Sequence, residues 1–256
     1  MTDAILLSQT DGPVTTLTLN APATINALSS AMLTSLDAAL DAIPTTTRAV
    51  ILRAAGRNFC AGHDLRELQS FRAAPDHGKA AFTRLFTLCA AVMQKIAALP
   101  QPVIAQVQGI ATAGGCQLAA TCDMVVASET ARFGINGVNI GLFCHTPLVA
   151  LSRKIAPAQA FDLAATGEFI SASRAQTLGL VTRLAAPDDL AQATLTLAQT
   201  LSQKLPLALA MGKRAAAQPL AAAYEKATLA MLENLLTPET AEGIAAFLEK
   251  RPPNWA

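Results

Sequence analysis

The chain has 256 residues, with 19 basic and 18 acidic side chains and a formal net charge of +1. This charge balance argues against a general surface for nucleic acid or anionic membranes, so any phosphate recognition must be local. A chain of this length buries roughly three-quarters of its unfolded surface. It therefore forms one large domain, or one domain with a small appendage, without needing disulfides or a metal.

The five cysteines are odd in number and include no Cys-x-x-Cys pair. They are typical of small apolar core residues in a reducing compartment, and a cysteine nucleophile would also need a positioned base. The N-terminus shows no basic segment followed by an apolar core, so we expect no signal peptide and a cytoplasmic protein. The uncharged stretch 96–122 is interrupted by prolines, glycines and glutamines, and we interpret it as buried core, not as a membrane span.

Strand-like and helical patterns alternate through the first half of the chain, which indicates an α/β domain with largely parallel sheets. The expected elements are a hairpin with strands 5–9 and 14–19, a helix that starts at Ser29 or Ser30 and continues to Ile43, a strand at 49–53, a helix at 79–98, a strand at 103–107, a helix at about 114–121 and a strand at 124–127.

After Pro147 the pattern is almost entirely helical, with Pro157 at the start of one helix and Gly167 at its end. Further helices are expected at 172–178, 188–204, 207–217, 220–235 and 238–250, with one strand at 181–184. Because no low-complexity linker interrupts the chain, we expect an α/β core over residues 1–195. A helical region over 196–256 then packs on this core or on neighbouring subunits.

Two glycine-bearing segments follow predicted strands and carry the first chemical signal. In residues 58–65, Gly62 lets the backbone turn sharply, so the amide of His63 can face a cavity. In residues 109–117, Gly114 lies where a helix starts, and the first N–H groups of a helix have no internal acceptor. Two such donors would together stabilise the oxyanion or enolate of a thioester, although each segment alone is more often only a tight turn.

Five segments, taken in order, resemble the crotonase (enoyl-CoA hydratase/isomerase) family, and the resemblance covers essentially the whole chain. They are Asn-Ala-Leu at 26–28, Phe-Cys-Ala-Gly-His-Asp-Leu at 59–65, a stretch with Gly-Gly-Cys and Cys-Asp at 109–123, Arg-Phe-Gly at 132–134 with Gly-Leu-Phe at 141–143, and a C-terminal helix signature at 242–251.

The resemblance implies the crotonase fold, a spiral of repeated ββα units that forms two near-perpendicular sheets, followed by a helical trimerisation region. We expect a homotrimer or a hexamer. The resemblance also implies an oxyanion hole made by the amides of His63 and Gly114. Coenzyme A is expected only as part of the substrate, with no other cofactor. The positions expected to contact it are Ala27, Leu28, Ala61, His63, Asp64, Leu65, Gly114 and Lys213, the last of these near the CoA phosphates.

Typical hydratases of this family activate water and protonate the substrate with two glutamates, and the corresponding positions here are Gln117 and Gly137. Glutamine cannot act as a general base and glycine has no side chain, so we do not expect efficient hydration by the two-carboxylate mechanism. Gly-Cys-Gln at 115–117 and Gly-Leu-Phe-Cys-His-Thr-Pro at 141–147 resemble an enoyl-CoA hydratase domain-containing protein 3-like subgroup.

Other side chains are candidates to replace the missing acids. His145 is either an acid or base near neutral pH or simply a loop histidine. The side chain of His63 is a second candidate, and Gln117 could orient a water or the thioester oxygen. Asp64 is expected to cap the following helix. No His, Cys and Asp cluster has the spacing of metal ligands, so we expect no metal.

The leading hypothesis is a lyase or isomerase that acts on an acyl-CoA thioester in fatty acid metabolism, by isomerisation, thioester hydrolysis or slow hydration. One alternative is a non-catalytic acyl-CoA-binding or regulatory protein that keeps the pocket and has lost the chemistry. A third hypothesis is a structural oligomer with a vestigial pocket, which would have no affinity for CoA.

Overall fold

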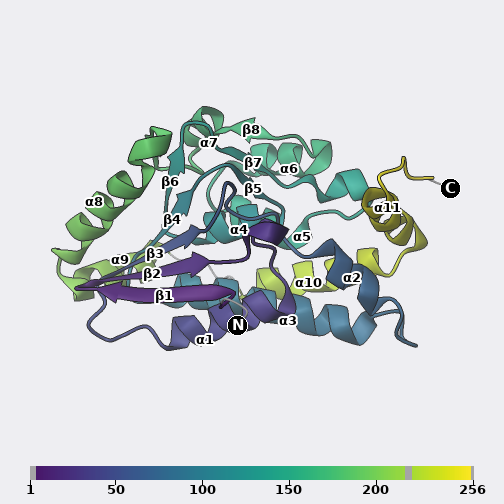
Figure 1. The fold of residues 1–256 in the computed structure, drawn as a ribbon, viewed down its shortest axis with the longest axis horizontal. Coiled ribbons are helices and arrows are strands. Elements are labelled where there is room, and N and C mark those ends of the chain that lie inside the picture. The colour runs from purple at the N-terminus through teal and green to yellow at the C-terminus, as the bar shows by residue number, and fades with distance from the viewer. Residues whose placement is uncertain (1–3, 217–220, 255–256) are drawn as a thin grey trace.

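The larger of two sheets has six strands in the order β1-β2-β3-β4-β6-β9, in a computed structural model that describes residues 4–216 and 221–254. β1 and β2 form the predicted antiparallel hairpin, and all the other neighbours are parallel (Figure 1). The strands are β1 (Leu6–Asp11), β2 (Val14–Leu19), β3 (Ala49–Ala54), β4 (Val103–Val107), β6 (Met124–Ser128) and β9 (Arg183–Ala185).

Helices cover both faces of this sheet: α1 (Ser30–Asp41), α3 (Lys79–Ala98) and α8 (Leu190–Ser202). Alternate side chains of β3 point to opposite faces, as the period of a strand requires. Val50 and Leu52 join the large core that contains the apolar residues of α1 and α3. Ala49 and Ile51 join a second core, with the apolar residues of α8. The near-continuous apolar run of β3 therefore follows from its burial on both sides.

The smaller sheet has three strands, β5 (Ile110–Thr112), β7 (Arg132–Gly134) and β8 (Ile170–Ser171), in the order β5-β7-β8. α4 (Gly114–Thr121) starts directly after β5 and packs on it. An isolated parallel bridge between Cys60 and Ala111 connects the first glycine-bearing segment to β5. The α/β architecture with two sheets agrees with the fold class predicted from the sequence.

Several short elements complete the α/β part, and the sequence patterns did not predict all of them. They are α2 (Leu65–Phe71), α5 (His145–Leu151), α6 (Pro157–Thr166) and α7 (Ala172–Leu178), with the 3-10 turns η1 (Pro22–Thr24), η2 (Asn136–Ile140) and η3 (Pro187–Asp189).

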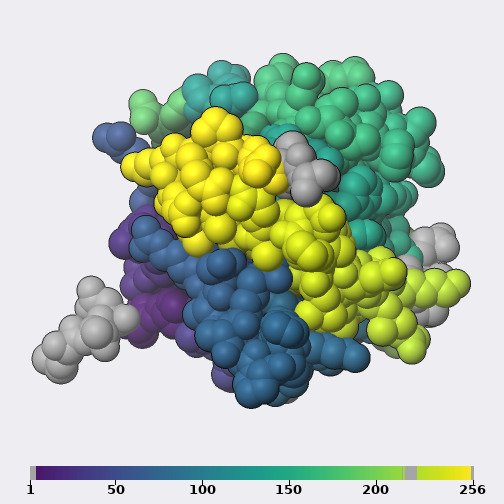
Figure 2. Space-filling model, turned by 90° about the vertical axis from the view of Figure 1, so that its right-hand side faces the viewer, coloured from purple at the N-terminus to yellow at the C-terminus, as the bar shows by residue number. Residues whose placement is uncertain are grey.

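The C-terminal helices are α9 (Pro206–Ala216), α10 (Ala221–Leu235) and α11 (Pro238–Glu249). α10 packs on α3 and α5, and α11 packs on α2 and η2, so the tail contacts its own core. Figure 2 shows the yellow C-terminal segment lying over the blue segment. The boundary expected after residue 195 falls inside α8, which packs on the sheet, so the helical tail begins at α9. The helix ends expected at residues 217 and 220 lie outside the described residues.

Among the described helices, α3 alone is long and apolar enough to cross a membrane by length and composition. Its apolar face, which includes Phe82, Phe86, Met93 and Ile96, lies in the protein core. The uncharged stretch 96–122 contains β4, β5 and α4, and most of it is buried.

Candidate active site

Asn26 holds together the loops that surround the site. Its backbone has a positive φ of 51°, and its side chain is buried. The side-chain Oδ1 accepts a hydrogen bond from the amide of Ala21 at 2.9 Å. The Nδ2 donates to the carbonyls of Ala55 at 2.9 Å and Asn58 at 3.1 Å. Residues 26–28 are therefore fixed against the loop that follows β3.

The first predicted oxyanion segment is tied directly to Leu28. The Leu28 amide donates to the carbonyl of Gly62 at 2.8 Å, and His63 Nδ1 lies 3.0 Å from the carbonyl of Leu28. Gly62 has a φ of +88°, which favours glycine. A Cβ at this position would lie 2.9 Å from the amide nitrogen of Gly114, so a side chain here would cover that donor.

The second segment makes a sharp turn from β5 into α4. Ala113, the residue before the helix, has φ 48° and ψ −122°, a strained conformation for a residue with a side chain. Its amide donates to the carbonyl of Gly134 at 2.9 Å, which holds the turn. A Cβ at Gly115 would overlap the carbonyl oxygen of Cys60, so the two segments pack with their backbones in contact.

The amides of His63 and Gly114 are the two donors that this packing brings together. A Cβ at Gly114 would lie 3.4 Å from the Cα of Gly62 and 3.5 Å from Cδ2 of His63. Neither amide donates to a backbone acceptor within the described part of the chain. Gly114 is also the first residue of α4, where the helix dipole favours negative charge. The arrangement suits an oxygen atom that becomes negative during a reaction.

The imidazole of His63 is neutral and fixed in place. Burial lowers its pKa to about 4, although the hydrogen bond to Leu28 acts in the opposite direction. Since the carbonyl of Leu28 can only accept, Nδ1 carries the proton and Nε2 has a free lone pair. Nε2 is buried and has no hydrogen-bond partner among the described residues. The ring packs edge-on against Phe86, with centroids 4.7 Å apart.

Gln117 lies one turn further along α4 and is fully buried. Neither its Oε1 nor its Nε2 has a well-formed hydrogen bond within the described residues. Tyr224 of α10 approaches it: burial raises the pKa of this phenol, and interactions with Thr121 and Gln117 oppose the rise. Tyr224 was not predicted from the sequence. Its one available signal was that the chain contains a single tyrosine, within an otherwise apolar and Ala-rich helix.

Gly137, where typical hydratases carry their second glutamate, has no room for any side chain. A Cβ there would overlap the carbonyl oxygen of Leu142 and lie 2.8 Å from Sγ of Cys144. The Gly137 amide lies 3.3 Å from the same sulfur and donates to it. Burial raises the pKa of the Cys144 thiol to about 11, so it stays protonated. The local backbone therefore excludes the second carboxylate by shape.

His145 is the first residue of α5 and is partly buried. Its Nδ1 lies 2.9 Å from the carbonyl of Phe143, and its ring packs edge-on against the ring of the same residue. Burial lowers its pKa, and the Phe143 carbonyl and Glu233 raise it. Within the described residues, no hydrogen bond joins His145 to His63 or Gln117, so its participation in chemistry stays a prediction.

Asp64 caps α2 as expected: its side chain accepts from the amides of Arg66 at 2.9 Å and Glu67 at 3.3 Å. Glu67 in turn accepts from the amide of Ser30 at the start of α1, which fixes the two helix starts against each other. Of the other positions expected to contact CoA, Ala27 and Leu28 are buried, and Ala61 and Leu65 are partly buried.

Lys213, the residue predicted to lie near the CoA phosphates, has three partners within its own chain. Its Nζ forms an ion pair with Asp123 at 2.7 Å and donates to the carbonyls of Ile96 and Gln101, each at 3.1 Å. An ammonium group has three N–H donors, so these partners use all of them. Lys213 thus joins α9 to the core, and a contact with the CoA phosphates stays a prediction.

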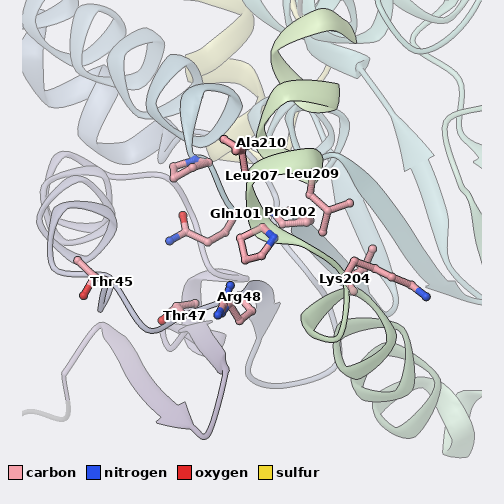
Figure 3. Close-up of a pocket in the computed structure, with 12 residues that line it drawn as sticks. Thr45, Thr47, Arg48, Gln101, Pro102, Lys204, Leu207, Leu209 and Ala210 are labelled. Carbon is pink, nitrogen blue, oxygen red and sulfur yellow. The ribbon is translucent and has the colours of Figure 1, made fainter.

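Two surface pockets lie away from the oxyanion amides. One, of about 360 Å³, is lined by Arg48, Gln101, Lys204 and Leu207 and lies where α9 meets the segments before β3 and β4 (Figure 3). The other, of about 440 Å³, lies between the sheet and α8. Neither pocket includes His63 or Gly114 among its lining residues. The described residues contain no group of three or more His, Cys, Asp or Glu placed to hold a metal ion.

Comparison with known sequences decides the family of the chain. The sequence profile of the enoyl-CoA hydratase/isomerase family matches residues 9–256. The chain belongs to this family. Enoyl-CoA hydratase domain-containing protein 3 of Xenopus laevis is 39% identical, with 99% of this chain and 86% of that protein covered. The human protein of the same name is also 39% identical, with 97% and 82% covered.

Solved structures confirm the crotonase fold. A structure of an enoyl-CoA hydratase from Mycobacterium smegmatis is 46% identical, covers 98% of both chains and has a TM-score of 0.78. The structure of human enoyl-CoA hydratase domain-containing protein 3 is 36% identical, covers 98% of this chain and 100% of that chain, and has a TM-score of 0.77. The resemblance to this subgroup, inferred from residues 115–117 and 141–147, is thus confirmed.

The expected cytoplasmic location was wrong by the same comparisons. The Xenopus, zebrafish and human relatives at 39% identity are all named as mitochondrial proteins.

Proposed function

We propose that this protein is an enzyme that binds an acyl-CoA thioester and stabilises negative charge on the thioester oxygen with the amides of His63 and Gly114. The observation that carries the proposal is the packing of Gly62 against Gly114. This packing supports the proposal because neither the His63 amide nor the Gly114 amide has a backbone acceptor among the described residues, and Gly114 starts α4. An oxyanion donor of this kind contributes about 3–4 kcal/mol to catalysis in known cases.

The polarised carbonyl is the step shared by three reactions. Removal of a proton next to the carbonyl gives an enolate and leads to isomerisation of a double bond. Attack of water at the carbonyl carbon gives a tetrahedral oxyanion and leads to thioester hydrolysis. Attack of water at the β-carbon gives hydration. The pair of carboxylates that makes hydration fast is absent, because Gln117 is an amide and Gly137 has no side chain. Each of the three reactions therefore needs another group to take up a proton, and the imidazole of His145 is the first candidate for that role.

A non-catalytic acyl-CoA-binding or regulatory protein is the second candidate function. The observation in its favour is the backbone around Gly137, which excludes a side chain and keeps Cys144 as a neutral thiol. A protein of this kind would retain the oxyanion amides to hold a thioester without turning it over.

Titration calorimetry with CoA, acetyl-CoA and crotonyl-CoA, followed by mass spectrometry of the crotonyl-CoA mixture, separates these functions. A shifted double bond, a released acid or a gain of water supports an enzyme and identifies the reaction. Binding without change selects the binding protein. No binding to any thioester contradicts both.

The oxyanion assignment has its own pair of variants. Gly114→Pro removes the proposed donor N–H at the first helical position, where proline is tolerated. Gly114→Ala keeps the N–H and adds a Cβ that approaches its neighbours no closer than 3.3 Å. We expect thioester turnover to fall roughly 100- to 1000-fold in the proline variant. The alanine variant should stay within about tenfold of wild type. Equal turnover in the two variants would contradict the assignment.

A further inference from the structure

The buried amide of Gln117 is poorly satisfied, because Tyr224 approaches it without forming a well-made hydrogen bond. Its side chain is fully buried, yet neither polar atom forms a well-made hydrogen bond within the described residues. Thr146 on α5 is also buried, and its Oγ1 has no partner there either. α5 packs closely on α4. Buried polar groups are normally satisfied, so unpaired ones indicate a place for water or a ligand.

Along α4, Gln117 lies between Gly114 and Thr121, and Tyr224 interacts with the latter. Gly114, Gln117 and Thr121 are three and four residues apart on α4, so they share one face of the helix. Side chains on a helix lean toward its N-terminus, which directs Gln117 toward Gly114. On the other side, the hydroxyl of Tyr224 interacts with Thr121 and approaches Gln117. This hydroxyl reaches the face from α10, which packs on α3 and α5.

Both groups are uncharged. A glutamine amide offers two N–H donors and one carbonyl acceptor, and a protonated phenol offers one donor and one acceptor. Burial raises the pKa of Tyr224, so the phenol keeps its proton at neutral pH. The pair can therefore donate to an oxygen atom and also accept from a hydroxyl group.

We propose that Gln117 and Tyr224 form a neutral polar subsite that binds an oxygen atom on the acyl group and selects oxygenated acyl groups over hydrocarbon chains. Gln117 makes the contact, and Tyr224 is a positioning residue that orients the amide. This inference rests on the proposed function, because it assumes that a thioester occupies the adjacent oxyanion amides. A hydrocarbon chain would leave the buried amide unpaired, and sites built to hydrogen-bond a substrate strongly reject analogues that lack the group.

Calorimetry with four-carbon thioesters of equal length tests the selectivity. We expect 3-hydroxybutyryl-CoA and acetoacetyl-CoA to bind roughly tenfold more tightly than butyryl-CoA. Gln117→Met, which keeps the length of the side chain, should remove this preference and leave the affinity for butyryl-CoA unchanged or improved. Tyr224→Phe should reduce the preference, and the effects of the two substitutions should not add, because both act on one contact.

The stability of the unliganded protein gives a second readout. Gln117→Met removes a buried amide that lacks a well-made hydrogen bond and leaves Tyr224 its interaction with Thr121, so the melting temperature should rise by a few degrees. Gln108 offers a matched control, because its Nε2 donates to the carbonyls of Ala54 at 2.7 Å and Gly56 at 3.1 Å. Gln108→Met should lower the melting temperature. A structural role for Gln117 would instead lower it in both variants, and that result overturns the inference.

The outcomes separate this inference from the function on which it rests. If no thioester binds, the proposed function fails and the subsite fails with it. If all the thioesters bind equally and Gln117→Met changes no ratio, the subsite alone is wrong. A preference for oxygenated acyl groups that Gln117→Met abolishes supports both.

Discussion

At Gly62 and Gly115, the missing side chain makes room for a backbone atom of the opposite oxyanion segment. A Cβ at Gly62 would lie against the amide nitrogen of Gly114, and a Cβ at Gly115 would overlap the carbonyl of Cys60. Each glycine therefore allows two backbone segments to come close together. Only Gly62 also has a positive φ that favours glycine. Single atoms decide the geometry of the site here, before any side chain takes part.

His63 should make the fold sensitive to mild acid. Its pKa is about 4 in the folded protein, against an ordinary value of 6.5. Between these values the unfolded chain binds a proton that the folded chain does not, so stability falls as the pH drops. We expect a loss of about 2 kcal/mol between pH 7.5 and pH 5 from this residue. Urea unfolding of the wild type and of His63→Gln, each at pH 7.5 and at pH 5, measures this loss of stability.

The difference between these two proteins isolates His63, because the other titrating groups contribute equally to both. The loss on acidification should be about 2 kcal/mol smaller in His63→Gln. An equal loss in both proteins would show that the imidazole is already exposed to water.

Lys213 should matter for stability and not for CoA. Lys213→Met removes the cation that pairs with the partly buried carboxylate of Asp123. The carboxylate then keeps its hydrogen bond from the amide of Val103. We expect a loss of about 2–3 kcal/mol in the free energy of unfolding. Lys204, which is exposed in the loop before α9, gives the control variant Lys204→Met. Affinities for CoA and 3′-dephospho-CoA should change equally, if at all. A selective loss of affinity for CoA would restore the phosphate contact that the sequence suggested.

At the scale of elements, η2 and α5 determine which acids the site can hold. The turn that connects them folds the carbonyl of Leu142 and the sulfur of Cys144 over Gly137. Gly137→Ala should therefore cost about 2–3 kcal/mol or more, since a side chain there meets backbone. Gln117→Glu meets no such obstacle. Thermal unfolding of both variants should show this contrast.

The same packing predicts that two substitutions will not create a hydratase. Gln117→Glu with Gly137→Glu should unfold at a lower temperature than Gln117→Glu alone. It should not hydrate crotonyl-CoA, as followed by the absorbance of the conjugated double bond. Fast hydration by the double variant would mean that the turn from 137 to 144 rearranges easily.

The sequence was informative for long periodic elements and for backbone motifs. The expected helix at 79–98 and strand at 103–107 have the bounds that the structure shows, because strong periodicity and Pro100 define them. A helix after Asp64 was expected, but the bounds of α2 were not, because only seven residues form it and Leu68 is its one buried residue. Strands of two or three residues, as in the smaller sheet, carry too few side chains for a period to be visible.

The same distinction between local and long-range structure applies to the residues of the site. The sharp turn at Gly62 and the helix start at Gly114 were predictable because local glycines specify them, and the role of the two amides stays a prediction. Tyr224 was not, because it meets Gln117 through the packing of α10, more than a hundred residues away in the chain. The lack of space for a side chain at Gly137 was not predictable either, because it depends on the carbonyl of Leu142 folding back over this residue.

At the scale of the whole molecule, the C-terminal tail leaves apolar side chains uncovered after it has packed on its own core. Leu207 and Met211 on α9 are 62% and 55% exposed, and Leu229 on α10 and Phe247 on α11 are 62% and 59% exposed. Long apolar side chains on three consecutive helices exceed the scattered exposure normal for a monomer. These helices are therefore the expected surface of a homotrimer.

Light scattering coupled to gel filtration should give a mass three or six times the 26.5 kDa of the chain. Leu207→Glu with Met211→Glu should lower this mass, because charges on a buried interface remain unpaired. Leu7→Glu, on strand β1 outside the tail and 45% exposed, should leave it unchanged. A monomer mass for the wild type would contradict the trimer. A trimer that survives the double substitution would place its interface away from α9, and the analogous pair on α10 and α11, Leu229→Glu with Phe247→Glu, would then be the one to dissociate it.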